Sequence, residues 1–332
     1  MIDRNDPRLY GLKTEEHNPE PIVNDAGIPV SNDLYNALEF ISKSFELAGA
    51  IGYDVFNDKI CATGPLPWDK DWQCPREWDD NDTTRLCAHL SRVHQYRCSP
   101  MMADRAVASV AADSRFNPLQ DYLMSLHWDG TSRVRDMLRD YFSAKGDDEY
   151  LRLVSTKMMV ASVRRALHPG CKHDCMPVLE GPQGGGKSSA LAALYGQEYI
   201  SDSIGAIKDV NSREGLSHMA GKWCLEFAEL TSMKSTDIDA MKDFLSGQTD
   251  RYRLPYAKHA KDYPRRCVFV GTHNPSGNGW AKDITGNRRF WPVQVGQVSV
   301  AAIENDRDQL WAEAVHMSEV EHQLHYFTAA EE

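Results

Sequence analysis

The 332-residue sequence predicts an α/β fold in which a mainly parallel sheet is flanked by helices and preceded by a small, mostly helical N-terminal domain. Two observations support this prediction. Beyond residue 170, short apolar runs alternate with helix-prone segments, which is typical of parallel strands joined by helices. Before that point, apolar residues recur mainly at helical spacing. The expected strands are residues 176–180, 198–201, 222–228, 267–272 and 290–295.

Composition changes along the chain predict four parts. Residues 1–30 are rich in Pro, Asn, Asp and Glu and lack periodicity, so we expect a poorly ordered arm. Residues 31–116 are expected to form the small, mostly helical domain. Residues 117–170 have apolar positions at helical spacing and are expected to be a helical linker. Residues 171–332 contain all the expected strands and form the sheet domain.

Charge and hydropathy exclude several classes of protein. The net charge of −11 argues against a protein that coats nucleic acid nonspecifically, so any nucleic-acid contact is expected to be local. The sequence has no apolar run approaching the roughly 18 residues of a membrane span and no secretory signal at its start, so we expect a cytoplasmic chain without membrane contact.

The eight cysteines are scattered and are expected to be reduced thiols. The alternative of a zinc site at Cys171, His173 and Cys175 lacks a fourth ligand nearby.

The most informative motif is Gly-Pro-Gln-Gly-Gly-Gly-Lys-Ser at residues 181–188, which matches the phosphate-loop pattern directly after an expected strand. Its glycines permit a tight loop whose N–H groups face a phosphate, and Lys187 brings charge to the β- and γ-phosphates. The Ser188 hydroxyl is expected to bind Mg²⁺, so ATP and Mg²⁺ are the expected cofactors. A chance glycine-rich turn is the alternative, which the strand–loop–helix context disfavours. The expected nucleotide-binding residues are Gly181, Gly184, Gly185, Gly186, Lys187, Ser188 and Ser189.

Acidic and polar residues at two later strand ends supply further candidates for hydrolysis. Glu226 is expected to hold Mg²⁺ and Glu229 to orient water, although the two roles could be exchanged. Solvated glutamates at a strand end are the alternative. Asn274 is expected to sense the γ-phosphate, a role compatible with a turn before Pro275.

Arg288 and Arg289 precede the last expected strand, where a guanidinium can reach the γ-phosphate of a neighbouring subunit. We expect one of the two to act in this way and the other to form a structural ion pair. The sequence does not distinguish them.

Residues 251–266 form a basic segment with interleaved tyrosines, which is typical of a loop or hairpin that grips a nucleic-acid backbone and can stack on bases. A solvated, charged hairpin is the alternative. The expected DNA-binding residues are Arg251, Arg253, Lys258, His259 and Lys261.

The motifs together resemble the virulence-associated protein E family, whose members are phage- and island-encoded ATPases similar to superfamily 3 helicases of the AAA+ class. The resemblance implies a P-loop AAA+-like ATPase that assembles into a ring, expected to be a hexamer, and translocates on single-stranded DNA. It also places a channel hairpin at residues 253–262. Its distinctive strings are residues 117–123, 128–130, 169–172, 179–184, 223–230, 250–256, 286–292 and 306–314.

These expectations leave two hypotheses. The first is an ATP-dependent DNA helicase or translocase in the replication of a phage or mobile element. The second is a nucleotide-gated interaction module, either a helicase loader or a factor that captures a host or phage replication protein through the N-terminal domain. Strand displacement discriminates the two. A metabolic kinase would leave the basic, tyrosine-bearing segment unexplained.

Overall fold

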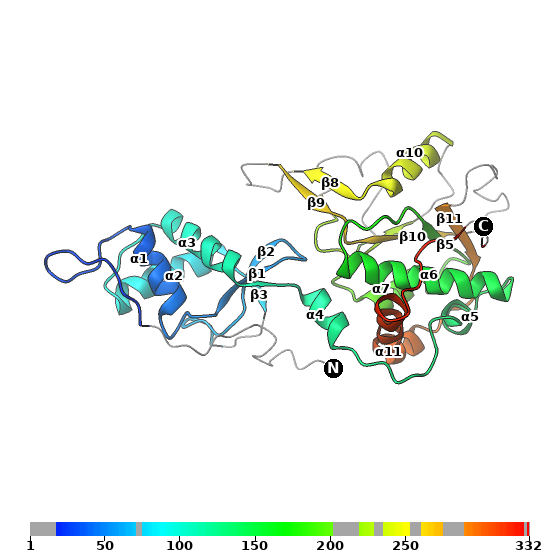
Figure 1. The fold of residues 1–332 in the computed structure, drawn as a ribbon, viewed down its shortest axis with the longest axis horizontal. Coiled ribbons are helices and arrows are strands. Elements are labelled where there is room, and N and C mark those ends of the chain that lie inside the picture. The colour runs from blue at the N-terminus through cyan, green and yellow to red at the C-terminus, as the bar shows by residue number, and fades with distance from the viewer. Residues whose placement is uncertain are drawn as a thin grey trace. The chain divides into compact units, whose positions relative to one another are not determined.

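The computed structural model describes residues 18–70, 75–201, 219–228, 235–252, 260–274, 289–328 and 331. The chain splits into two compact units, Met1–Asp121 and Tyr122–Glu332. The division falls within helix α4 (Pro118–Ser125), whereas the sequence analysis placed the end of the N-terminal domain after residue 116. Figure 1 shows the elements of both units. None of the helices in these ranges is long and apolar enough to cross a membrane.

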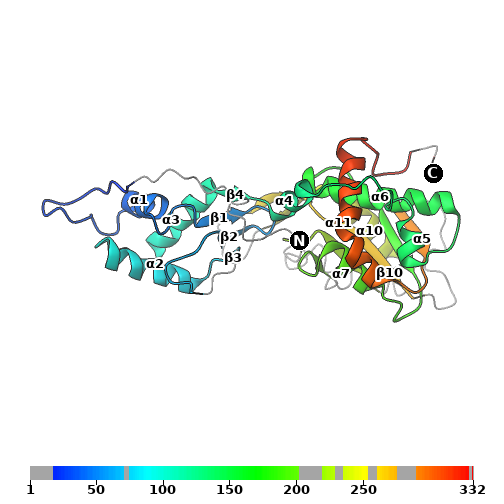
Figure 2. The same cartoon turned by 90° about the horizontal axis from the view of Figure 1, so that it is seen from below.

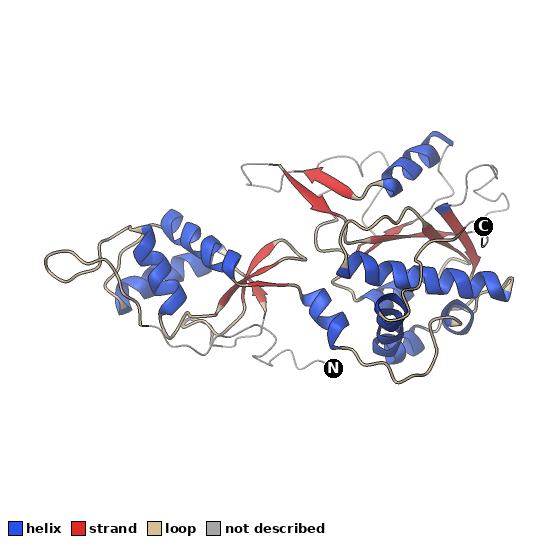
Figure 3. Cartoon of the chain, viewed as in Figure 1, coloured by secondary structure: helices blue, strands red, loops and turns tan. Residues whose placement is uncertain are grey.

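The N-terminal unit combines three helices with a small four-stranded sheet of order β3-β2-β1-β4 (Figure 3). The helices were predicted. The sheet was not, because its strands have only two to four residues, too few to show a period of two. The helices are α1 (Leu34–Lys43), α2 (Asp80–Val93) and α3 (Pro100–Asp113), and the strands are β1 (Ile51–Asp54), β2 (Lys59–Ala62), β3 (Arg76–Glu77) and β4 (Arg115–Phe116).

A capping residue marks the start of each of these helices. The Asp33 side chain caps α1, and Ser99 caps α3 with proline at its first position. Asp79 and Asp82 form a reciprocal capping box at the start of α2. The apolar faces of the three helices pack together in one core, whose fully buried members include Ile41, Leu86, Leu90, Tyr96 and Ala106.

The described part of the expected arm is tied to α1. Buried Asn36 accepts a hydrogen bond from the N–H of Ile22 at 2.6 Å and donates to the Ile22 carbonyl oxygen at 2.8 Å. The N–H of Glu20 also donates to Glu39 at 3.1 Å. From residue 20 onward the segment is therefore held by specific hydrogen bonds, which composition alone did not indicate.

The second unit contains a five-stranded sheet of order β11-β5-β10-β7-β6 in which every pairing is parallel. This confirms the predicted parallel α/β fold, and each expected strand is present within two residues of its predicted limits. The strands are β5 (Met176–Glu180), β6 (Ile200–Ser201), β7 (Cys224–Phe227), β10 (Val268–His273) and β11 (Phe290–Gln294).

Helices cover both faces of this sheet. On one face, Leu225, Phe227 and Phe269 pack with Phe244 of α10. Because side chains alternate along a strand, Glu226 points to the opposite face, where α7 lies against β7 and α6 against β10. Helix α11 packs on α6 and α7 (Figures 1 and 2). The helices are α5 (Met137–Phe142), α6 (Asp148–Leu167), α7 (Lys187–Tyr195), α10 (Ser235–Ser246) and α11 (Val300–Glu319).

A buried aromatic cluster fixes α7 against these neighbours. The rings of Trp223 and Trp311 lie 4.2 Å apart between centroids, and Tyr195 lies 5.1 Å from Trp223. Each indole N–H also finds a carbonyl: Trp311 donates to Leu194 and Trp223 to Ser162, both at 2.8 Å. The cluster therefore adds directed bonds to apolar burial and holds the helix that begins at the glycine-rich loop.

A separate antiparallel hairpin, β8 (Thr249–Tyr252) with β9 (Lys261–Pro264), lies between β7 and β10 in the chain. Arg265, directly after β9, forms a two-pronged ion pair with Asp250 in β8, with both N–O distances 2.7 Å and both side chains buried. The Arg265 guanidinium also lies 4.3 Å from the centre of the Phe244 ring and donates to the Phe244 carbonyl. The base of the hairpin is thus bonded to α10.

We expect Asp250→Ala to destabilise the protein by about 3–5 kcal/mol, because it leaves a buried guanidinium without its counter-charge. Urea unfolding followed by circular dichroism measures this loss. Asp262→Ala is the matched control, because its ion pair with Arg251 on the same hairpin is exposed. The control is expected to change stability by about 0.5 kcal/mol or less, and equal losses in the two variants would contradict the anchoring role of Arg265.

Candidate functional site: the phosphate loop and its acid

The glycine-rich loop joins the end of β5 to the start of α7. Gly184 and Gly186 have φ of 76° and 86°, a left-handed backbone that favours glycine. Gly181 is needed for another reason: a Cβ there would lie 2.7 Å from the Val295 carbonyl oxygen, just after β11. A Cβ at Gly185 would lie 3.1 Å from the Pro182 carbonyl oxygen. Backbone conformation and close approach therefore both explain the glycines.

Backbone hydrogen bonds hold this loop in place on two sides. The Gly181 N–H donates to the His273 carbonyl at the end of β10, at 3.1 Å. On the other side, the N–H of Val298 donates to the Gly185 carbonyl, also at 3.1 Å. The loop is therefore held by the carboxyl end of β10 and by the segment that follows β11, the two strands that flank β5, at the edge where open α/β sheets bind ligands.

Lys187 is buried and points back under the loop. Its ammonium donates to the carbonyls of Gly181 at 2.7 Å and Pro182 at 2.9 Å, and to Oδ1 of Asn274 at 3.0 Å. Burial lowers the pKa of Lys187, while the nearby charge of Glu226 acts in the opposite direction. Three neutral acceptors thus orient a cation in a partly desolvated position, where attraction for an anion is stronger than in water. The structure also brings together Lys187 and Asn274, which are 87 residues apart.

Glu226 lies on β7 beside the first turn of α7 and is 1% exposed. Its Oε1 accepts two hydroxyl hydrogen bonds, from Ser188 and from Thr272, each at 2.7 Å. Its Oε2 is buried and has no hydrogen-bond partner among the described residues. A buried carboxylate with one unused oxygen, next to a serine hydroxyl, is an oxygen donor set that suits a hard divalent cation such as Mg²⁺. The residues predicted to hold Mg²⁺ are therefore in direct contact with each other.

Thr272 was not singled out by the sequence analysis. The register pairs Val270 of β10 with Glu226 of β7, and Thr272 lies two residues further along the same face. Alternation within the apolar strand could have identified it, because a hydroxyl on that face lies toward the phosphate loop. Knowing that residue 270 pairs with residue 226 requires the fold.

The remaining predicted residues fall into two groups. Arg289 forms an ion pair with Asp174 at 3.2 Å, the structural role expected for one of the two arginines. On the hairpin, Arg251 pairs with Asp262 at 3.3 Å, and Lys261 is exposed in β9. Five other predicted site residues lie outside the described residues: Glu229, Arg288, Arg253, Lys258 and His259.

Two of the interleaved tyrosines are already engaged. Tyr252 is buried and stacks on Tyr263 across the hairpin, with ring centroids 4.2 Å apart and planes at 24°. This pairing uses one face of each ring to stabilise the hairpin, so the expectation that they stack on bases needs correction for the buried Tyr252.

The alternative zinc site is also not formed. Cys171, His173 and Cys175 do not bring three possible ligand atoms together within the described ranges. His173 is instead packed between Trp291 and His325, with centroids at 6.2 and 5.8 Å, and burial holds its pKa well below the usual value.

The strand order, the glycine loop after β5 and the acid on β7 together define a P-loop AAA+-like α/β domain. The chain belongs to the virulence-associated protein E-like family: the profile of the Virulence-associated protein E-like domain matches residues 123–332. The resemblance inferred from the motifs is thereby confirmed. A comparison with the curated proteins finds no match.

Solved structures with a related fold share little sequence with this chain. The apo structure of the NrS-1 C terminal region (305–718) is 11% identical to this chain, with a TM-score of 0.52. The match covers 84% of this chain and 68% of the NrS-1 chain. An A form apo structure of the same region is 12% identical over the same shares, with a TM-score of 0.48. An inhibitor-bound JCV helicase is 15% identical, with a TM-score of 0.32. The match covers 66% of this chain and 67% of the helicase chain. The first of these supports a shared fold.

We expect Thr272→Val to destabilise the protein by about 1–3 kcal/mol, because it removes a hydrogen bond to a buried carboxylate while keeping the side-chain shape. A double-mutant cycle with Glu226→Ala, followed by urea unfolding, measures the coupling of the two side chains. We expect a coupling of about 0.5 kcal/mol or more. Thr156→Val is the control, since Thr156 is equally buried in α6, and its effect should add to that of Glu226→Ala. Full additivity for Thr272 as well would contradict the hydrogen bond.

Proposed function

We propose that the chain is an ATP-dependent DNA translocase or helicase of the superfamily 3 type that acts in the replication of a phage or mobile element. The observation that carries the proposal is the contact of Ser188 with Glu226 beside Lys187, at the carboxyl edge of a parallel sheet. Membership of the virulence-associated protein E-like family supports the same assignment.

In this proposal, the phosphates of ATP lie over the loop at residues 181–186 and against the N-terminus of α7, where free N–H groups and the helix dipole favour an anion. The Lys187 ammonium exchanges at least one of its three acceptors for a phosphate oxygen. Mg²⁺, when bound, would neutralise charge on the β- and γ-phosphates, held by the Ser188 hydroxyl and the Glu226 carboxylate.

Asn274 is proposed to report on the γ-phosphate, because its amide already contacts Lys187 through Oδ1. Movement of the Lys187 ammonium toward phosphate would free that oxygen for a new partner. Glu229 is proposed to orient the attacking water, three residues beyond the metal-side acid. These roles divide the binding of metal and the activation of water between two acids on the same segment.

Subunit assembly into a ring, which we expect to be a hexamer, would complete the site. Arg289 is held by Asp174 within its own chain, so Arg288 is the better candidate for stabilising the γ-phosphate of a neighbouring subunit. The ion pair within one chain supports a structural role for Arg289, which is the role expected for one of the two residues.

The hairpin is the proposed contact with single-stranded DNA. Its base is fixed by the buried Arg265–Asp250 pair, while Lys261 is exposed. Residues 251–261 carry the five basic positions predicted to bind a backbone: Arg251, Arg253, Lys258, His259 and Lys261. A fixed base would couple the hairpin to the ATPase sheet, while its basic residues contact the DNA backbone. Because the chain as a whole is acidic, this contact is local.

We expect Lys187→Ala to abolish steady-state ATP hydrolysis, and Lys258→Ala combined with Lys261→Ala to leave basal hydrolysis but remove its stimulation by single-stranded DNA. The control is Lys145→Ala combined with Lys172→Ala, which removes the same charge from exposed positions outside the hairpin and should keep the stimulation. Turnover with and without DNA, together with strand displacement, tests the proposal. Undiminished stimulation in the hairpin variant would overturn the DNA assignment, and nucleotide binding without any DNA response would favour the interaction module.

A further inference from the structure

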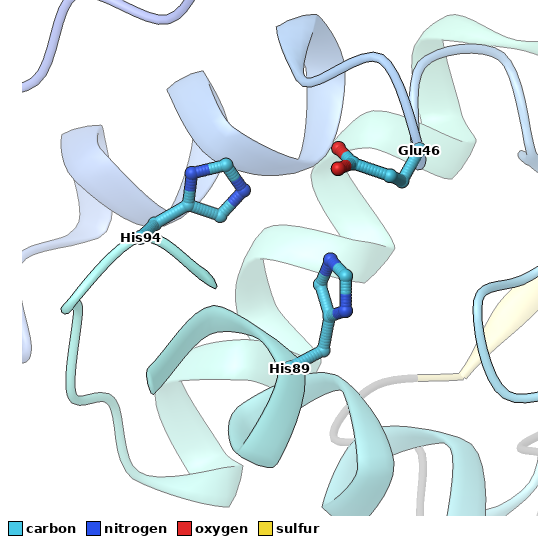
Figure 4. Close-up of side chains that lie close together, drawn as sticks. All are labelled: Glu46, His89 and His94. Carbon is cyan, nitrogen blue, oxygen red and sulfur yellow. The ribbon is translucent and has the colours of Figure 1, made fainter. Parts of the chain in front are cut away.

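The N-terminal unit, which lies outside the family match at residues 123–332, contains a cluster of two histidines and a carboxylate. Glu46 lies in the turn after α1, His89 in the last turns of α2, and His94 at the C-cap of the same helix. Each offers one ligand atom, and these three atoms lie within 4.8 Å of one another. Figure 4 shows both imidazole rings turning a nitrogen toward the space beside the Glu46 carboxylate.

Three of the four histidine nitrogens in this cluster are buried and have no hydrogen-bond partner among the described residues. His89 is 6% exposed, and both of its ring nitrogens are buried without a partner in the described part of the chain. The same is true of Nε2 of His94. Buried polar atoms are nearly always paired, because an unpaired one loses its hydration without compensation. Three such atoms on two adjacent rings therefore point to a partner that a protein hydrogen bond does not supply.

The protonation state of the rings suits a cation. Burial lowers the pKa of both His89 and His94, with the Glu46 charge acting in the opposite direction on each. A lower pKa favours the neutral imidazole, which has the lone pair that a metal ligand requires. The Glu46 carboxylate adds the negative charge, and its exposed side chain can rotate toward the rings.

Ring contacts also hold the two histidines in place. His94 stacks on Phe40 with centroids 4.6 Å apart and planes at 24°, and the ring of His89 lies edge to face with that of Trp68 at 6.1 Å. Simple packing in an aromatic core would explain these contacts. It does not explain why nitrogens of both rings face a carboxylate, since lone pairs lie in the ring plane and take no part in stacking.

We propose that Glu46, His89 and His94 bind a divalent first-row transition-metal ion, with Zn²⁺ as the best match. Two imidazoles and one carboxylate with a position left for water form a donor set that Zn²⁺ accepts. The three ligand atoms lie within 4.8 Å of one another, whereas tetrahedral coordination at about 2.0–2.2 Å needs them roughly 3.3 Å apart, so the side chains must close in on the ion. The ion would cross-link the turn after α1 to the end of α2 and give one nitrogen of each ring a partner.

The test uses the full chain, stripped of metal by a chelator and titrated with Co²⁺ as a spectroscopic probe for Zn²⁺. We expect one strong site per chain, whose visible spectrum shows d–d bands without thiolate charge transfer, and displacement of Co²⁺ by added Zn²⁺. Zn²⁺ should also raise the melting temperature of the metal-free protein, because a ligand that binds the folded state stabilises it.

Glu46→Gln is the decisive variant, because Glu46 is exposed and its loss should leave the fold intact, as circular dichroism can verify. We expect it to weaken Co²⁺ binding at least roughly tenfold, since even outer-shell partners of a metal contribute about that much. His89→Gln should do the same. His127→Gln is the control, since His127 is exposed in the other unit, and should bind as the wild type does.

Three results would each overturn the proposal. The first is the absence of strong binding by the wild type. The second is a spectrum dominated by thiolate charge transfer, which would place the ion on cysteines. The third is unchanged affinity in a correctly folded Glu46→Gln variant. None of these outcomes depends on nucleotide or DNA, so the proposal stands or falls independently of the proposed function.

Discussion

The two hydroxyl hydrogen bonds accepted by Glu226 are the interaction on which the candidate site depends. Ser188 belongs to α7 and Thr272 to β10, so a single carboxylate oxygen joins the first turn of the phosphate-loop helix to two neighbouring strands. The carboxylate is buried at low dielectric, where such charge-assisted bonds are strong and the loss of one is costly. Its other oxygen has no partner within the described ranges, which leaves one coordination position directed into the site.

Contacts in the rest of the second unit keep the phosphate loop and α7 in position. The His273 carbonyl at the end of β10 and the Val298 N–H beyond β11 bond the loop on its two sides. The Trp223–Trp311 pair packs against α7, where Trp311 donates to the Leu194 carbonyl. The hairpin is held in a similar way. The buried Arg265–Asp250 ion pair closes its base, Arg265 also donates to the Phe244 carbonyl of α10, and the basic residues lie between these two ends. A nucleotide-dependent change at the loop could therefore reach the hairpin through packed strands and helices, the kind of contiguous contact that transmits coupling.

How much the sequence predicted depends on whether a signal is local. The glycine loop, Lys187 and Ser188 were found because the motif is contiguous, and the five parallel strands because apolar runs alternate with helices. Thr272 was missed because its role depends on a strand register that only the fold supplies. The N-terminal sheet was missed because strands of two to four residues are too short to show a period of two. Arg289 could be assigned to an ion pair only once Asp174, 115 residues away, lay beside it.

Equilibrium binding of an ATP analogue, measured with and without Mg²⁺, tests whether Glu226 and Ser188 hold the metal. We predict that Mg²⁺ tightens binding to the wild type and that Glu226→Gln removes most of this enhancement, while Glu229→Gln keeps it, because Glu226 contacts the Ser188 hydroxyl. Metal-free binding should be similar in all three proteins. Equal enhancement by Mg²⁺ in the wild type and Glu226→Gln would contradict the account and place the metal-binding acid elsewhere.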